Sequence, residues 1–382
     1  MKKIVVTGAT SMIGVALIEV CLKHNIEVHA IIRPGTNRQD RIIKDGNVHY
    51  HLSYLDDLLD IQDLPSDCDV FYHFAWAGTD RLHRDDPEVQ VQNIKYSLDS
   101  VKLAKKCGCN RYVGAGSQAE YGPCDSVIDE NTLYNPVTAY GSAKYAASIL
   151  CKKLCGLLDI AFVWGRICSV YGPHDNSQTM LMYAIDCFNK GITAKFSEGT
   201  QIWNFLYESD AGEIFFKLAD DNVSEGVYIV ASEESLPLKE YLNILIESYP
   251  AKVNAIFGNA TKKYSANTKN DNLLQSIKSS GNNKVFSLNV NAAKTFNTIN
   301  YHTKVSFNTG IINTIKYIMN MHNCDNNKYR GGVTDLFIRK KYIFSLINKA
   351  LLDVKFLFCC FRKSEKKFIS VGSSTQGVNY EL

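Results

Sequence analysis

The sequence lacks a strong charge excess, a long apolar run and a paired cysteine motif, and each absence removes a class of protein. Its 42 basic and 39 acidic residues leave a net charge of only +3, which predicts no nucleic-acid partner. The first apolar run, residues 4–6, ends at Thr7 and is too short for a secretory signal. The twelve cysteines contain no Cys-x-x-Cys pair, which predicts reduced thiols in a cytoplasmic protein and no metal site. Cys151 and Cys155, one helical turn apart, are expected to pack in the core.

The chain begins with a strand, a glycine-rich turn and a helix, the context in which a glycine motif predicts a dinucleotide site. Gly8 permits the tight turn and Gly14 lets helix and strand approach closely, while Ser11 replaces the usual middle glycine. The alternative is an ordinary strand-to-helix turn without a ligand. We expect the cofactor pyrophosphate at the helix N-terminus. The residues expected to bind it are Gly8, Thr10, Ser11, Met12, Ile13 and Gly14.

The second strand pattern, residues 27–32, ends at Arg33, where dinucleotide sites carry a residue that recognises the adenosine ribose. An acid there accepts from the 2′-hydroxyl of NAD, whereas an arginine accommodates the 2′-phosphate of NADP. Arg33, with Arg38 and Arg41 close behind it, therefore predicts NADP. NAD remains the alternative if Arg33 is only a solvated loop charge.

Strand and helix patterns alternate as far as about residue 170, which predicts an α/β protein with a doubly wound parallel sheet of the Rossmann type. Further elements are expected as strands at 48–52, 69–77, 111–115 and 160–167 and as a helix over 88–107. Ligands of such sheets bind at the carboxyl ends of the strands. The residues expected beside the cofactor there are Ser53, Tyr54, Phe74, Ala75 and Trp76.

Tyr140 and Lys144 are four residues apart in a predicted helix and therefore share one face. A lysine ammonium there is expected to lower the tyrosine pKa and to make the phenol a proton donor and acceptor near neutral pH. Ser117 is expected in a glycine-bounded loop after the strand at 111–115, where its hydroxyl would hold a substrate oxygen. Without the N-terminal motif, a surface tyrosine stacked on a lysine stem would be the simpler explanation.

Together these motifs resemble the extended short-chain dehydrogenases/reductases, in the group of NAD(P)-dependent nucleotide-sugar epimerases and dehydratases. The resemblance covers about residues 1–320. It is carried by Thr7-Gly8-x-x-Ser11-x-x-Gly14, His73-x-Ala75, Asn93, Ser117 five residues before Gly122, Tyr140-x-x-x-Lys144, Arg166, Tyr171-Gly172-Pro173 and the stretch 204–210. The departures are Ser11 for glycine, Trp76 for a small residue and Asn204 for an arginine or aspartate.

For the site, the resemblance implies an enzyme with a nucleotide-sugar substrate. The implied catalytic residues are Ser117, Tyr140 and Lys144, of which the last two also contact the cofactor. Asn93 is implied to order the cofactor site. The residues implied to contact the substrate are Ser117, Gln118, Tyr140 and Asn204. Members of this family often pair as homodimers through a four-helix bundle.

Two domains and a tail are expected. The boundaries are 1–173 with a return segment 204–232 for the dinucleotide-binding domain, 174–203 and 233–321 for the smaller substrate domain, and 322–382 for a linker and a basic, apolar tail. Residues 260–283 are rich in Asn, Lys and Ser and are expected to form a mobile loop. Charges in the tail exclude a spanning helix. An amphipathic helix on a membrane surface or a partner, and a helix that covers the protein's own surface, both remain open.

The residues after Ser117 limit which reactions of this family the protein is expected to catalyse. Dehydratases of this group carry an Asp-Glu pair there, and epimerase-reductases like fucose synthase carry a cysteine two positions on; Gln118 and Ala119 match neither. A 4-keto-6-deoxyhexose reductase and a 4-epimerase with recycled cofactor remain. Arg33 favours the reductase, because NADPH is the usual reductant for net reduction. A non-catalytic NADP(H)-binding protein is the distant alternative.

Overall fold

The computed structural model describes residues 1–258 and 286–329. Of these, residues 1–249, 253–258 and 286–321 belong to one compact unit, and residues 250–252 and 322–329 belong to a second. The predictions of a mobile loop over 260–283 and of a tail helix beyond residue 329 lie outside the described residues. Within the described ranges, every helix is too short or too polar to cross a lipid bilayer.

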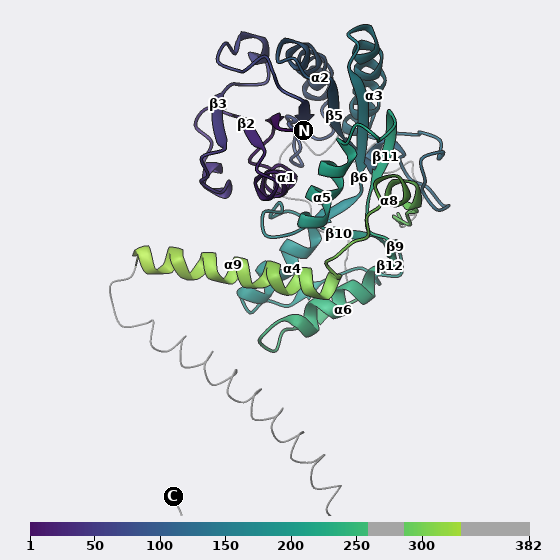
Figure 1. Ribbon diagram of the computed structural model, residues 1–382. Helices are drawn as coiled ribbons and strands as arrows, with labels where there is room; N and C mark the ends of the chain where they lie inside the picture. Colours follow the sequence, from purple (N-terminus) through teal and green to yellow (C-terminus); the bar gives the residue numbers. More distant parts are fainter. Residues whose placement is uncertain (259–285, 330–382) are drawn as a thin grey trace, which may run out of the picture. The chain divides into compact units, whose positions relative to one another are not determined.

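A seven-stranded sheet organises the larger unit, in the order β11-β6-β5-β4-β1-β2-β3 (Figure 1). Its strands are β1 (Lys3–Thr7), β2 (Glu27–Ile32), β3 (Val48–Leu52), β4 (Val70–His73), β5 (Arg111–Ser117), β6 (Ala161–Ile167) and β11 (Gly226–Val230). Every neighbouring pair is parallel. The strand order reverses between β1 and β4, which is where doubly wound sheets bind their ligands. The predicted Rossmann-type fold is confirmed.

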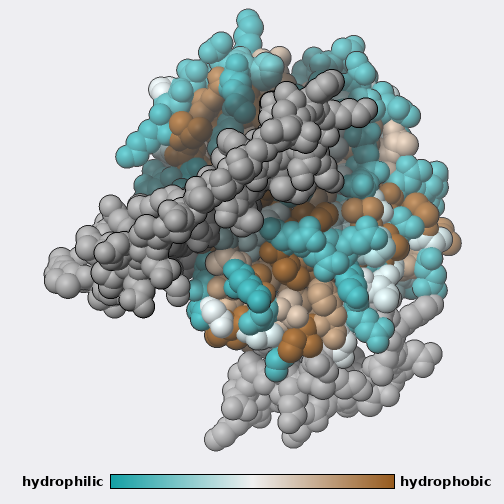
Figure 2. Space-filling model, turned by 90° about the horizontal axis from the view of Figure 1, so that it is seen from below, coloured by the Kyte–Doolittle hydropathy of each residue, from teal (hydrophilic) through white to brown (hydrophobic). Residues whose placement is uncertain are grey.

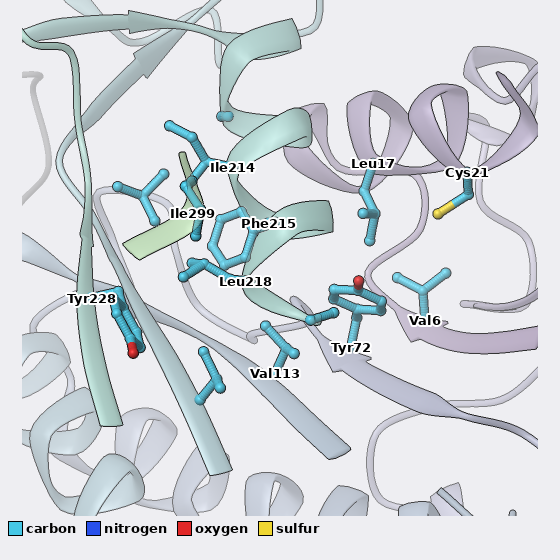
Figure 3. Close-up of a cluster of buried hydrophobic side chains, with 14 of the residues drawn as sticks. Val6, Leu17, Cys21, Tyr72, Val113, Ile214, Phe215, Leu218, Tyr228 and Ile299 are labelled. Atoms are coloured by element: carbon cyan, nitrogen blue, oxygen red, sulfur yellow. The ribbon is translucent and has the colours of Figure 1, made fainter. Parts of the chain in front are cut away.

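Helices cover both faces of the sheet (Figure 1). On one face lie α1 (Met12–Lys23) and α5 (Glu208–Leu218), and on the other lie α2 (Pro87–Lys106) and α3 (Ala139–Leu157). Val6 and Tyr72 are partners in the register of β1 and β4, and they pack with Phe215 of α5 (Figure 3). Their neighbours Val5 and Phe71 belong to the core under α2 and α3. Because successive strand residues face opposite sides, two apolar residues in a row bury both faces of the sheet.

The cysteines are mainly core residues. Cys151 and Cys155 of α3 are fully buried, so the expectation that they pack in the core is confirmed. Nine cysteines whose side chains the structure describes are free, and seven of these are buried. The other two, Cys124 and Cys168, are half-buried. Burial raises the pKa of the Cys151 thiol to about 12, which keeps it protonated and unreactive in the folded state.

The three helices beside the candidate site begin at capping side chains. Ser11 caps α1, Asp86 caps α2 and Thr138 caps α3. In each case a side-chain oxygen accepts from a backbone N–H of the first turn, at 3.0–3.1 Å. Such a cap stabilises a helix by about 1 kcal/mol. The caps therefore fix where the first turns of these helices lie.

The strand expected over 69–77 ends earlier than predicted, at His73. The chain leaves the sheet because the side chain of Asn93 on α2 holds the backbone of Ala77. Asn93 Oδ1 accepts from the Ala77 N–H at 2.8 Å, and its Nδ2 donates to the Ala77 carbonyl at 3.0 Å. Residues 74–77 thus form a loop at the carboxyl end of β4, next to the glycine-rich turn.

Most of the remaining elements build a third cluster of buried side chains. They are β7 (Ser169–Tyr171), β8 (Ala194–Lys195), β9 (Ile202–Trp203), β10 (Phe205–Tyr207), β12 (Leu236–Pro237), β13 (Ala255–Ile256), α4 (Met180–Asn189), α6 (Leu238–Ser248) and α9 (Phe307–Tyr329). Helix α8 (Ala293–Ile299) instead adds Phe296 and Ile299 to the core that α1 and α5 share. Short 3₁₀ turns are η1 (Gln39–Arg41), η2 (Leu58–Asp60) and η3 (Gln118–Glu120). Leu181, Phe205, Tyr241 and Phe307 are core members of this cluster. Seen from below, hydrophobic residues form separate patches among hydrophilic ones, as on an ordinary protein surface (Figure 2).

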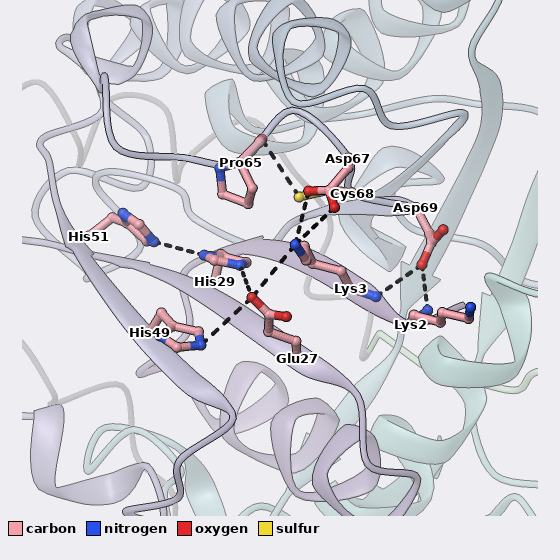
Figure 4. A network of polar contacts seen from close by, with 10 residues as sticks. All are labelled: Lys2, Lys3, Glu27, His29, His49, His51, Pro65, Asp67, Cys68 and Asp69. Atoms are coloured by element: carbon pink, nitrogen blue, oxygen red, sulfur yellow. Dashed lines mark hydrogen bonds and ion pairs between the residues drawn. The ribbon is translucent and has the colours of Figure 1, made fainter.

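A polar network joins β1, β2 and β3; it consists of Lys3, Glu27, His29, His51 and Asp67 and is called the histidine network below (Figure 4). His29 Nδ1 lies 3.0 Å from His51 Nε2, and His29 Nε2 lies 2.9 Å from Glu27 Oε1. Lys3 Nζ donates to Asp67 Oδ1 at 2.9 Å. Both histidines are buried, but the side chains of Glu27 and Asp67 are 38% and 72% exposed. Burial lowers the pKa of His29, so this ring is neutral at physiological pH.

Candidate active site

The glycine-rich turn after β1 passes directly over the chain that leaves β4. Gly8 has a φ of +70°, and a Cβ there would lie 2.6 Å from the Ala75 nitrogen. A Cβ on Gly14 would lie 2.4 Å from the Gly8 carbonyl oxygen. Only glycine fits both positions. The turn, with half-buried Thr10, Ser11, Met12 and Ile13, leads into the first turn of α1. The Gly14 N–H donates to the Ser11 hydroxyl, and the N–H groups of Met12 and Ile13, which have no intrahelical acceptor, fit an anionic pyrophosphate.

Arginines gather in the chain after β2, where a dinucleotide's adenosine ribose would lie. Arg33 follows the last residue of β2, and Arg33 and Arg38 are both exposed. Arg41 is half-buried, and its Nη1 donates to the carbonyl of His174 at 3.3 Å. Arg41 is therefore partly engaged within the protein, while Arg33 and Arg38 face solvent and fit a 2′-phosphate.

Four other residues expected beside the cofactor lie at the carboxyl ends of strands. After β3, the buried Ser53 hydroxyl donates to the carbonyl of Tyr54, whose side chain is largely exposed. After β4, the Phe74 ring packs against Phe215 with ring centroids 4.8 Å apart. Trp76 donates from Nε1 to Gln90 Oε1 at 2.9 Å. These contacts fix Phe74 and Trp76 to the body of the fold and leave Tyr54 open to a ligand.

Ser117 is the last residue of β5, not part of the following loop, and a buried ion pair fixes it. Its backbone N–H donates to Glu120 Oε1 at 2.8 Å, and its hydroxyl accepts from the Ala119 N–H at 3.2 Å. The other oxygen of Glu120 accepts from Arg166 Nε at 2.7 Å. Glu120 is 0% exposed and Arg166 is 1% exposed. Glu120 is therefore a structural residue that holds the Ser117 backbone.

Lys144 is buried one helical turn after Tyr140. Its Nζ donates to the carbonyl of Ala115 on β5 at 2.6 Å and lies 3.7 Å from the centroid of the Trp76 ring. Burial lowers the pKa of Lys144 to about 7, and the nearby Glu120 carboxylate opposes that change. The ammonium is therefore in balance with the neutral amine near physiological pH.

The prediction that Lys144 lowers the pKa of Tyr140 is wrong for this structure. Tyr140 is buried in the first turn of α3, and burial raises the pKa of its phenol. Arg84 and the Ser117 hydroxyl oppose this effect. Lys144 Nζ is 6.0 Å from the centroid of the tyrosine ring and is bound to the Ala115 carbonyl. The phenol is consequently held in its protonated form before any reaction.

Arg84 is a site residue that the sequence did not predict; its guanidinium carbon lies 4.0 Å from the centroid of the Tyr140 ring. Arg84 belongs to the loop between β4 and α2, a stretch of mixed charges without a periodic pattern. Its position depends on long-range contacts of that loop with the start of α3. A local sequence signal for such contacts does not exist.

Gln118 and Asn204 were predicted to contact the substrate, and the structure corrects the prediction for Asn204. Asn204 is fully buried, and its Nδ2 has acceptors in Ser232, Glu234 and Ser235 at 2.9–3.1 Å. Its Oδ1 accepts from the Ser232 N–H at 2.8 Å. Asn204 therefore holds the loop after β11, and its amide is not available to a substrate. Gln118, by contrast, is half-buried at the start of η3, directly after Ser117.

Comparison with known proteins places this geometry in a family. A model of the "NAD dependent epimerase/dehydratase family" matches residues 4–231. CDP-abequose synthase of Salmonella typhimurium is 24% identical over 260 residues, which cover 66% of this chain and 83% of that protein. A putative UDP-glucose 4-epimerase of Methanocaldococcus jannaschii is 23% identical over 220 residues, 55% of this chain and 71% of that protein.

Solved structures agree on the fold. The UDP-glucuronic acid 4-epimerase from Bacillus cereus in complex with NAD superposes with a TM-score of 0.68 at 20% identity, covering 84% of this chain and 98% of that one. The UDP-N-acetylglucosamine 4-epimerase from Methanobrevibacter ruminantium M1, in complex with UDP-N-acetylmuramic acid, gives 0.70 at 17% identity, covering 84% and 99%. Because the family model spans more than half of the chain, the protein belongs to the NAD dependent epimerase/dehydratase family.

Proposed function

We propose that the protein is an NADP-dependent oxidoreductase of nucleotide-activated sugars, and that it reduces a 4-keto-6-deoxyhexose. The observation that carries the proposal is the convergence of Ser117, Tyr140 and Lys144 at the end of β5 and the start of α3. A hydroxyl, a protonated phenol and an amine in one place suit carbonyl reduction, because the new alcohol needs a fixed oxygen and one proton.

In this proposal the Ser117 hydroxyl donates to the substrate carbonyl and holds its oxygen beside the Tyr140 phenol. The reduced nicotinamide supplies the hydride that the carbonyl carbon gains. Tyr140 gives its proton to the oxygen, which becomes the hydroxyl of the product. The raised pKa of Tyr140 suits this direction, since the phenol is protonated at the start. Lys144, with a pKa of about 7, carries a proton that exchanges near neutral pH and suits return of the tyrosine to its acid form.

The cofactor assignment rests on the fit of two places in the structure. The first turn of α1 offers N–H groups to a pyrophosphate, and Arg33 and Arg38 offer exposed guanidiniums to a 2′-phosphate. NAD is the second candidate, because solved relatives with this fold are described in complex with NAD. For the substrate, the relatives carry the names of CDP-, UDP- and dTDP-sugar enzymes, which supports a nucleotide-sugar. We assign the sugar nucleotide to the segments 174–203 and 233–321.

A nucleotide-sugar 4-epimerase is the second candidate function, favoured by the solved 4-epimerases with the same fold. The two differ in what happens to the cofactor. A reductase consumes one NADPH for each product, whereas an epimerase returns the hydride to the same sugar and needs no added reductant.

The test incubates the purified full chain with NADPH and nucleotide-4-keto-6-deoxyhexoses and follows the absorbance of NADPH, with product identification by NMR. We expect oxidation of one NADPH for each 4-hydroxy product formed. Interconversion of two 4-hydroxy sugars without added NADPH would overturn the reductase in favour of the epimerase. Tight NADPH binding without turnover of any sugar would favour a non-catalytic binding protein.

A further inference from the structure

A cation other than Lys144 lies against the ring of Tyr140. The guanidinium carbon of Arg84 is 4.0 Å from the ring centroid, whereas Lys144 Nζ is 6.0 Å away. A guanidinium at this distance over an aromatic face is within the range of cation–π attraction. The attraction grows when the ring carries negative charge, because the phenolate adds a full charge to the electron-rich face.

The backbone around Arg84 is tied to the start of α3. The Tyr140 N–H donates to the Arg84 carbonyl at 3.2 Å, and the Ala139 N–H donates to Asp85 Oδ1 at 2.8 Å. Further along, Gln90 Nε2 donates to the carbonyl of His83 at 3.0 Å. Arg84 is thus held over the tyrosine by contacts on both sides of it and is not a freely moving surface charge.

Other charged groups around Tyr140 are already engaged. Glu120 is paired with Arg166, Asp85 accepts from the N-terminus of α3, and Lys144 donates to a β5 carbonyl. Across the described part of the chain, no carboxylate lies within ion-pair distance of the Arg84 guanidinium. The charge of Arg84 is therefore available to the tyrosine.

We infer that Arg84 is a positioning residue for Tyr140. The Arg84 guanidinium stabilises the phenolate that forms when Tyr140 gives up its proton. This inference rests on the proposed role of Tyr140 as the proton donor. Arg84 opposes the effect of burial on the pKa of Tyr140, in agreement with the geometry. Lys144 loses its charge around pH 7, but arginine keeps its charge across the range of enzyme assays, so Arg84 supports the phenolate at alkaline pH as well.

The test measures the acidity of Tyr140 directly. Protein labelled with 3-fluorotyrosine, whose phenol is more acidic than that of tyrosine, is titrated by ¹⁹F NMR with NADP⁺ bound. The Tyr140 resonance is assigned by its loss in Tyr140→Phe. In Arg84→Gln we expect the titration midpoint to rise by about one pH unit, the lower end of the effect of a nearby opposite charge. Arg84→Lys should restore most of the shift. Arg81→Gln removes an exposed arginine of the same loop and should leave the midpoint unchanged.

An unchanged midpoint in Arg84→Gln would overturn the inference, and so would an equal rise in Arg81→Gln. If Arg84→Gln does not fold, Arg84→Met replaces it, because methionine keeps much of the side-chain volume without the charge. The same rise of the midpoint is expected for that variant. Because the titration needs no sugar, its result is separate from that of the turnover assay. Failure to turn over any sugar substrate would refute the proposed function, whereas the measured acidity of Tyr140 would still decide whether Arg84 stabilises the phenolate.

Discussion

The ion pair behind Ser117 and the histidine network both join neighbouring parts of the sheet, but water reaches them to different degrees. Glu120 and Arg166 are completely buried, whereas Glu27 and Asp67 of the histidine network are open to solvent. Removal of one partner from a buried pair leaves an unpaired charge and costs about 3–5 kcal/mol. An exposed pair contributes about 0–1 kcal/mol. Burial, more than the number of contacts, therefore decides how strongly a network fixes its surroundings.

The largest expected effect comes from breaking the buried pair. Glu120→Ala should lower the free energy of unfolding by about 3–5 kcal/mol, because the buried Arg166 keeps its charge but loses its carboxylate partner. Urea denaturation, with midpoint and slope fitted separately, measures the change. Asp67→Ala, in the exposed part of the histidine network, is the matched control and should lower the free energy of unfolding far less, because water screens its charge. Equal losses in the two variants would refute the contrast.

The second effect concerns Tyr140, the proton donor of the proposed mechanism. Tyr140→Phe should lower kcat about a hundredfold or more, the scale of lost general acid catalysis. NADPH affinity and the urea midpoint should stay close to those of the unchanged protein, since the ring and its contacts with Arg84 and Trp76 remain. Turnover near the original rate would remove Tyr140 from the proposed mechanism.

The third variant changes Arg33, an exposed charge that is expected to bind the 2′-phosphate of NADP. Arg33→Asp should weaken NADPH binding by about 1.5–3 kcal/mol, roughly ten- to a hundredfold, and should improve NADH relative to NADPH. Fluorescence titration with both cofactors measures the ratio. Lys44→Asp makes the same kind of charge change at an exposed position in the same loop and should leave the ratio unchanged. An unaltered ratio in Arg33→Asp would favour NAD.

The smallest effect tests the buried half of the histidine network. Burial lowers the pKa of His29 in the folded chain, while Glu27 opposes it. As the pH falls below about 6.5, the unfolded chain takes up the proton first, so the free energy of unfolding falls by at most about 1.4 kcal/mol per pH unit for this group. His29→Gln should make this acid slope shallower, and His49→Gln, at an exposed ring, should not. Identical slopes for all three proteins would contradict the assignment.

How much the sequence could predict depended on the range of the interaction concerned. Strand β2 was predicted at its observed bounds, because apolar runs and glycine breaks are local signals. The shared face of Tyr140 and Lys144 follows from helical spacing alone. The direction of the Tyr140 pKa was predicted wrongly, since it depends on burial and on where the Lys144 ammonium is bound. Arg84 was out of reach, because tertiary contacts of its loop bring it to the tyrosine.

The difference in burial between Cys124 and Cys151 makes thiol labelling a measure of local unfolding. A thiol reagent meets the half-buried Cys124 in the folded state, but it meets Cys151 only when α3 separates from the sheet. The same helix carries Tyr140 and Lys144. The labelling rate of Cys151, measured by mass spectrometry relative to that of Cys124, therefore reports how often α3, which carries the candidate catalytic pair, separates from the sheet. A ligand that stabilises the packed state of α3 should slow the labelling of Cys151.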